Sequence, residues 1–177
     1  MNTMPLPKLS LVLGGAASGK SAFAENLVLQ SGNAPVYLAT AQVFDDEMAE
    51  KVARHRDMRG AGWVTIEEPL DLGPALAQIT PQQTVLIDCA TLWLTNVILG
   101  DHDVTNHTNA LLTAIAACQG PVVMVSNEVG QGIVPDNALS RKFRNAQGGL
   151  NQQIAAEAGL VVAVMAGLPL VLKGQLP

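Results

Sequence analysis

The sequence predicts an α/β fold in which helices flank a mostly parallel sheet. Apolar runs of strand length alternate with helical or polar segments along the chain, and this alternation is typical of parallel strands joined by helical crossovers. Hydrophobic residues make up 49% of the chain and charged residues only 14%, which suits central strands buried on both faces. With 177 residues the chain is long enough for one sizeable core, so residues 1–177 are expected to form a single domain.

The expected elements follow the hydrophobic pattern in order. Strands are predicted where short apolar runs occur, at 9–13, 35–40, 63–67, 84–88, 121–126 and 160–165. Helices are predicted at 22–29, 45–59, 70–79, 92–99, 110–118 and 137–159, and the polar stretch 101–108 is predicted to be a loop. A last strand at 170–173 follows a link too short for a crossover, so it should be an antiparallel edge strand.

A glycine-rich segment with the pattern G-x-x-x-x-G-K-S joins the first strand to the first helix. Its residues are Gly14, Gly15, Ala16, Ala17, Ser18, Gly19, Lys20 and Ser21. In this context the pattern predicts a phosphate-binding loop, whose backbone N–H groups and helix start surround a phosphate. Lys20 would reach the outer phosphates as a catalytic residue, and the Ser21 hydroxyl would bind Mg²⁺. The segment therefore predicts a nucleoside triphosphate and a metal.

Asp88 closes the apolar strand 84–88 and is the second candidate metal ligand. A carboxylate at the end of a buried strand binds Mg²⁺, directly or through water, in many phosphate-loop proteins. The alternative is that Asp88 caps the helix near Leu92.

Other polar groups follow the predicted strands. Ligands of parallel sheets bind beyond the carboxyl ends of the strands, so each such position is a candidate. They comprise Thr40, Ala41 and Gln42, then Glu67–Glu68, Asp88–Cys89 and Asn127–Glu128. Glu128 is a candidate base or an anchor for its loop. Arg141 and Arg144 lie one helical turn apart, where they hold a substrate phosphate or form a solvated face, and His102 and His107 are expected at the surface.

His55 lies near the end of the predicted helix 45–59, which begins acidic and ends basic, as the helix dipole favours. One interpretation is a solvated charged face. The other makes His55 a nucleophile, because a neutral imidazole can attack phosphorus and form a phosphoramidate. Nearby arginines would keep the ring neutral and attract phosphate.

Composition narrows the function classes. A net charge of −5 argues against a nucleic-acid binder, which usually carries a basic face. The first residues lack the apolar core of a signal peptide, and the longest apolar stretch is too short to span a bilayer, so a cytoplasmic protein is expected. Cys89 and Cys118 are expected to be buried free thiols.

Several blocks of sequence together resemble one family, the bifunctional adenosylcobinamide kinase / adenosylcobinamide-phosphate guanylyltransferases of cobalamin biosynthesis. The resemblance runs from the phosphate loop to about residue 158. It rests on residues 14–21, 37–41, 46–48, 55–59, 63–67, 126–135 and 143–152, of which 126–135 is the most specific.

The resemblance implies two reactions on one site. ATP or GTP would phosphorylate adenosylcobinamide, and GMP from GTP would then be transferred to that phosphate. It implies that His55 carries GMP covalently, and that the phosphate loop, Thr40–Gln42, Arg56, Asp57, Met58, Arg59, Glu67 and Asp88 line the nucleotide site. It also implies a RecA-like phosphate-loop (P-loop) NTPase fold and a homotrimer with its site near a subunit boundary.

The chain departs from the family pattern at three positions. Ala17 and Gly149 replace frequent arginines, and Gly60 replaces a common proline. These changes put rates and nucleotide preference in question more than the reaction. The rival functions are a P-loop small-molecule kinase without guanylyl transfer and a nucleotide switch, although a guanine-reading N-K-x-D motif is absent.

Overall fold

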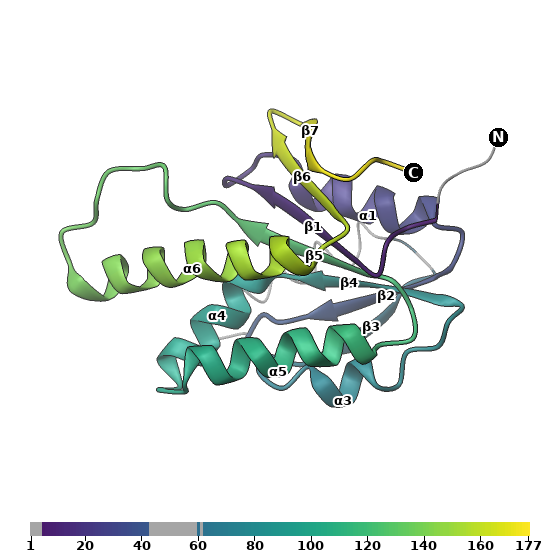
Figure 1. Cartoon of the computed structure of the whole chain (residues 1–177), viewed down its shortest axis with the longest axis horizontal. Coiled ribbons are helices and arrows are strands. Elements are labelled where there is room, and N and C mark those ends of the chain that lie inside the picture. Colours follow the sequence, from purple (N-terminus) through teal and green to yellow (C-terminus); the bar gives the residue numbers. More distant parts are fainter. Residues whose placement is uncertain (1–4, 43–59, 61) are drawn as a thin grey trace.

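The computed structural model describes residues 5–42, 60 and 62–177. In this part of the chain seven strands form one sheet in the order β3-β2-β4-β5-β1-β6-β7 (Figure 1). The strands are β1 (Leu9–Gly14), β2 (Ala34–Ala39), β3 (Val64–Glu67), β4 (Gln83–Asp88), β5 (Val122–Asn127), β6 (Leu160–Met165) and β7 (Leu168–Lys173). All neighbouring strands pair in parallel except β6 and β7, which are antiparallel. The predicted mostly parallel α/β fold with an antiparallel edge strand is therefore confirmed.

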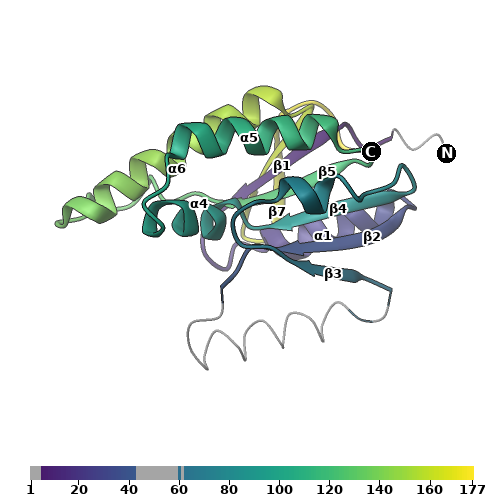
Figure 2. The ribbon, with the colours of Figure 1, turned by 90° about the horizontal axis from the view of Figure 1, so that it is seen from below.

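The described helices cover the two faces of the sheet unequally (Figure 2). They are α1 (Lys20–Gln30), α3 (Gly73–Leu76), α4 (Ala90–Leu99), α5 (Val104–Ala117) and α6 (Ala138–Glu157). One core cluster joins α3, α4, α5 and α6 to the sheet, and a second joins α1 to the opposite face. Strand residues alternate between the clusters, as Leu11 and Val12 of β1 do, because successive side chains of a strand point to opposite faces.

The predicted loop at 101–108 is wrong, because α5 begins at Val104 within it. The side chain of Asp103 accepts a hydrogen bond from the amide of Asn106 at 2.7 Å and caps the helix. Thr108, Leu111 and Ile115 then form the buried face of α5. The polar residues of the first turn are ordinary for a helix start, and they concealed it in the sequence.

The helix predicted at 70–79 is much shorter in the structure, where α3 covers only Gly73–Leu76. Beyond it the amides of Gln78 and Ile79 bond to carbonyls three residues back, which tightens and ends the helix. The helix predicted at 45–59 lies outside the described residues.

The β6–β7 hairpin forms one edge of the sheet and leaves β7 exposed throughout. Lys173 donates to the carbonyls of Ala155 and Ala156 at 3.0 and 2.9 Å, so the edge strand is tied to the last turn of α6. No described helix is long and apolar enough to cross a membrane.

Candidate active site

The phosphate loop occupies the turn between β1 and α1, as its pattern predicts. The amide of Ser18 donates to the carbonyl of Gly15 at 3.3 Å, and the loop turns into α1 at Gly19, whose φ is 91°. Lys20 folds back so that its ammonium donates to the carbonyl of Gly15 at 3.0 Å. The side chain is therefore held over the loop, where it can approach the outer phosphates of a nucleotide.

Two glycines of the loop are required by space. A Cβ on Gly14 would lie 2.3 Å from Ser18 Oγ and 2.7 Å from the carbonyl oxygen of Val164. A Cβ on Gly19 would lie 3.0 Å from Cα of Gly167, in the turn between β6 and β7. The amide of Gly167 also donates to the carbonyl of Ser18 at 2.8 Å. The loop is thus packed against the edge hairpin through backbone atoms.

Asp88 lies at the end of β4, partly exposed, and its Oδ2 accepts a hydrogen bond from the Tyr37 hydroxyl at 2.8 Å. It does not cap α4. That position is taken by Cys89, whose Sγ accepts from the amide of Leu92 at 3.5 Å. The structure therefore removes the capping alternative and leaves the carboxylate of Asp88 oriented by Tyr37.

Cys89 is inert as a nucleophile at neutral pH. Burial, with a further contribution from the negative charge of Asp88, raises the pKa of its thiol to about 11. The thiolate is the reactive form of cysteine, so Cys89 acts here as a small buried side chain. Both Cys89 and Cys118 are buried free thiols, as expected.

The residues present fit a magnesium ion held mainly by the nucleotide. Mg²⁺ usually takes one or two protein carboxylates and fills its remaining positions with phosphate oxygens and water. No cluster of three or more His, Cys, Asp or Glu side chains occurs among the described residues, so a cage made only of protein ligands is not found there. Ser21 in the first turn of α1 and Asp88 at the end of β4 are the two ligands that this arrangement would use.

The end of β2 is connected to the end of β4. Thr40 is buried, and its hydroxyl donates to the carbonyl of Cys89 and accepts from the Cys89 amide, both at 2.8 Å. Its own carbonyl accepts from the side chain of Asn96 at 2.8 Å. Thr40 therefore holds the two strand ends together, while Ala41 and Gln42 beyond it are partly exposed.

Among the candidates that the structure describes, Glu67 lies on the strand furthest from the phosphate loop. It is exposed at the end of β3, and three strands, β2, β4 and β5, separate β3 from β1. The structure therefore does not bring Glu67 into contact with the loop, although both lie at the carboxyl edge of the sheet.

Asn127 and Glu128 occupy the position between the phosphate loop and Asp88, because β5 lies between β1 and β4. The amide of Glu128 donates to the carbonyl of Gly14 at 3.0 Å, and the amide of Asn127 donates to the Thr91 hydroxyl at 2.9 Å. Glu128 Oε1 accepts from the amide of Gly130 at 2.5 Å. In the structure Glu128 has the loop-anchoring role considered for it.

A buried polar cluster beneath this strand end was not identified from the sequence. Ser126 donates to Asn151 Oδ1 at 2.6 Å, and Gln147 donates to both the Ser126 hydroxyl and Asn151 Oδ1 at 2.9 and 3.0 Å. Asn151 in turn donates to the carbonyl of Asn127 at 3.2 Å. The sequence signal was the spacing of Gln147 and Asn151, four apart on an otherwise apolar helix face.

Arg141 and Arg144 donate hydrogen bonds to backbone carbonyls of the segment before α6. Arg144 donates to the carbonyls of Gly130 and Gly132, and Arg141 donates to those of Pro135 and Asp136. Both arginines thus tie α6 to residues 128–137, here called the β5–α6 segment. Arg141 is exposed and Arg144 is partly buried, and a contact of either with a substrate phosphate stays a prediction.

The remaining predicted site residues, His55, Arg56, Asp57, Met58 and Arg59, lie outside the described residues. Of the three departures from the family pattern, Ala17 is exposed in the left-handed region with φ 54°, Gly60 has φ 76°, and Gly149 has open space around its Cβ position. His102 is exposed and His107 partly so, and their rings lie with centroids 4.9 Å apart and planes tilted by 38°.

Comparison with solved structures shows the fold. The flagellar accessory protein FlaH of Methanocaldococcus jannaschii is 12% identical, with a TM-score of 0.53 over 97% of this chain and 80% of that one. An ATPase from the type III secretion system of pathogenic bacteria is 10% identical, with a TM-score of 0.56 over 94% of this chain and 57% of that one. The fold is that of P-loop NTPases.

Comparison with characterised sequences shows the family. The bifunctional adenosylcobalamin biosynthesis protein CobP of Pseudomonas aeruginosa is 45% identical over 93% of this chain and 97% of its own length. The corresponding CobU proteins of Escherichia coli and Salmonella typhimurium are each 39% identical, over 92% of this chain and 98% of theirs. The model of one family matches residues 10–172. The chain therefore belongs to the cobinamide kinase / cobinamide phosphate guanyltransferase family.

Proposed function

We propose that this protein catalyses two reactions in cobalamin biosynthesis. It phosphorylates the aminopropanol hydroxyl of adenosylcobinamide with ATP or GTP, and it then transfers GMP from GTP to the new phosphate. The observation that supports this most is the meeting of the phosphate loop with the ends of β4 and β5, in a chain whose family match covers residues 10–172. We further propose that residues 1–177 act as one nucleotide-binding domain.

In the first reaction the acceptor hydroxyl oxygen attacks the γ-phosphorus, the bond to the β,γ-bridging oxygen breaks, and the hydroxyl proton is released. Lys20 would stabilise charge on the outer phosphates, which is the main requirement of phosphoryl transfer. A bound Mg²⁺, held by Ser21 and Asp88, would supply further neutralisation of the phosphates.

The second reaction would use two displacements at the α-phosphorus of GTP. An imidazole nitrogen of His55 attacks the α-phosphorus and pyrophosphate leaves. A phosphate oxygen of adenosylcobinamide phosphate then displaces the imidazole and gives adenosylcobinamide-GDP. The support for His55 is the sequence: one histidine among three arginines, which attract phosphate and disfavour a charged imidazole.

Covalent labelling tests this proposal. Incubation of the protein with α-labelled GTP should produce a label that is labile in acid and stable in base, and cobinamide phosphate should then remove it. His55→Ala should carry no label, whereas His102→Ala, an exposed histidine outside the site, should be labelled like the wild type.

Two results would contradict the covalent route: an unlabelled wild-type protein, or equal labelling of His55→Ala. If the wild-type protein carried no label, released no pyrophosphate from GTP and still phosphorylated cobinamide, the chain would be a P-loop kinase without guanylyl transfer. A homotrimeric state and a cytoplasmic location also stay predictions, and sedimentation measures the first of them.

A further inference from the structure

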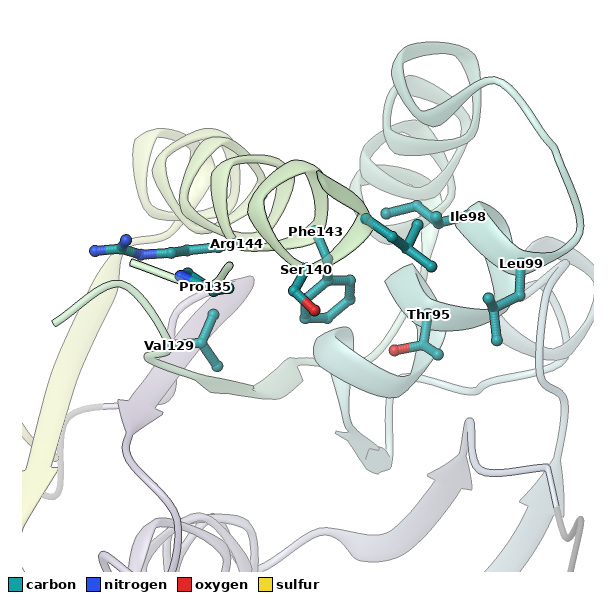
Figure 3. A pocket seen from close by; sticks show the side chains of 9 residues that line it. Thr95, Ile98, Leu99, Val129, Pro135, Ser140, Phe143 and Arg144 are labelled. Atoms are coloured by element: carbon teal, nitrogen blue, oxygen red, sulfur yellow. The ribbon is translucent and has the colours of Figure 1, made fainter. Parts of the chain in front are cut away.

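A pocket of about 390 Å³ lies between α4, α6 and the β5–α6 segment. Figure 3 shows its side chains coming from three elements: Thr95 and Leu99 from α4, Phe143 from α6, and Val129 and Pro135 from the segment. Of its lining residues, only Arg144 was considered from the sequence as part of a site. We refer to this cavity as the α4–α6 pocket.

The walls of this pocket continue directly from the proposed reaction centre. Val129 follows Glu128, whose amide is bonded to Gly14 of the phosphate loop at 3.0 Å. Helix α4 begins immediately after Asp88 and Cys89, and its Thr91 hydroxyl holds the amide of Asn127 at 2.9 Å. The pocket therefore adjoins the ends of β4 and β5, next to the proposed reaction centre.

The lining favours a ligand that is uncharged and largely apolar. Ile98, Leu99 and Phe143 supply apolar surface, while Thr95 and Ser140 supply hydroxyls. The Thr95 hydroxyl donates its proton to the carbonyl of Thr91 at 2.9 Å, so toward the pocket it can only accept a hydrogen bond. The single charged lining group, the guanidinium of Arg144, is directed to the carbonyls of Gly130 and Gly132.

Apolar surface extends beyond the mouth of the pocket. Leu99 and Leu139, which line the pocket, are 65% and 56% exposed, and the β5–α6 segment, which contributes Val129 and Pro135 to the lining, also exposes Ile133 at 97% and Val134 at 63%. Exposed apolar side chains at a cavity usually mark a binding surface. An open apolar lining of this kind suits a wide macrocycle whose rim carries methyl groups and carboxamide side chains, as a corrinoid does.

We propose that the α4–α6 pocket and its apolar rim receive one edge of the corrinoid ring of cobinamide, so that the hydroxyl arm reaches the end of the phosphate site. This inference rests on the proposed function, in which cobinamide is the molecule that accepts the phosphoryl group. The carboxamides would donate to the Thr95 hydroxyl, and the methyl groups would contact Phe143 and Leu139. Most of the ring would stay outside, because the pocket takes only part of it.

The test variant is Leu139→Glu. Leu139 is exposed in the first turn of α6, where a negative charge is favourable to the helix dipole, so the variant should fold. We expect the Kd for cobinamide, measured by equilibrium dialysis, to rise at least about tenfold, because the carboxylate must lose water against an apolar ring. Labelling by α-labelled GTP without cobinamide should be unchanged.

Two further variants complete the experiment. Leu99→Gln changes the opposite wall of the pocket and should also raise the Kd for cobinamide. Leu29→Glu is the matched control: it is 51% exposed on α1, on the other face of the sheet, and should leave cobinamide binding unchanged.

The possible results separate the pocket from the proposed function. If Leu139→Glu raised the KM for GTP and left the Kd for cobinamide unchanged, the pocket would hold the nucleotide base, and the inference would be overturned. It would also be overturned if the variant changed only the sedimentation of the protein, because the pocket would then be a subunit contact. A wild-type protein that bound no cobinamide would overturn the proposed function itself.

Discussion

The phosphate loop and the β5–α6 segment follow neighbouring strands at the same edge of the sheet, but they are built in different ways. Gly14 of β1 and Asn127 of β5 are paired in register, so the two segments leave the sheet at the same height along the strands. The phosphate loop is shaped by backbone contacts, with Gly14 and Gly19 in places where a Cβ has no room. The β5–α6 segment is longer and exposed, and side chains of Glu128, Arg141 and Arg144 hold it.

This difference separates two kinds of sensitivity to substitution. In the phosphate loop, an added methyl group at Gly14 or Gly19 is enough to disturb the backbone. In the β5–α6 segment the anchoring side chains matter more, and Gly132 has open space for a methyl group. Substitutions of glycines in the two segments, and of a side chain that anchors the β5–α6 segment, therefore test this comparison.

The largest effect is expected at Gly14. Gly14→Ala should lower the free energy of unfolding by about 2–3 kcal/mol, because the new Cβ overlaps the carbonyl of Val164 and forces backbone to move. Gly15→Ala is the matched control, since nothing lies within 4 Å of its Cβ position. Urea denaturation of both variants measures the difference, and equal midpoints would contradict the proposed rigidity of the loop.

A smaller and more local effect is expected at Arg144. Arg144→Ala removes the donors to the carbonyls of Gly130 and Gly132, and a hydrogen bond from a charged group contributes about 1.5 kcal/mol or more. Amide hydrogen exchange across residues 129–136 should therefore accelerate about tenfold.

Lys142→Ala is the control for this change, because it removes an exposed cation two residues earlier in α6. Exchange in α1 and in the phosphate loop should be unaffected in both variants. Unchanged exchange in the segment of Arg144→Ala would mean that the segment holds its shape without this side chain.

The smallest effect is expected from a glycine of the segment. Gly132 has open space at its Cβ position and is exposed, so Gly132→Ala should change the free energy of unfolding by less than about 0.5 kcal/mol. Gly19→Ala, at φ 91° and close to Gly167, should cost about 1–3 kcal/mol. Thermal unfolding of both variants measures their changes in free energy of unfolding, and equal changes would contradict the prediction.

The sequence predicted the phosphate loop because its determinants are local. The glycines, Lys20 and the flanking apolar and helical runs all lie between residues 9 and 29, so the local pattern specifies the backbone directly. The alternation of apolar runs likewise predicted the parallel sheet and its antiparallel edge, since residues 167–169 leave no room for a crossover.

The rest of the site depends on contacts between distant residues. The position of Glu128 beside the phosphate loop follows from the strand order, which no local pattern specifies. The attachment of Arg144 to Gly130, and of Asn151 to Asn127, needs α6 to be packed against β5. For the same reason the α4–α6 pocket is found only in the folded chain. The roles of His55 and residues 56–59 stay predictions.

The contact between the edge hairpin and the phosphate loop has a consequence for peptide orientation. In a trans peptide the C=O and the following N–H point in opposite directions. Because the carbonyl of Ser18 is held by the amide of Gly167 at 2.8 Å, the N–H of Gly19 points away from the hairpin. One donor of the loop is thus turned before any nucleotide arrives, so this peptide need not be ordered at the moment of binding. If the loop binds phosphate as proposed, the neighbouring hairpin would act as a preorganising support for anion recognition.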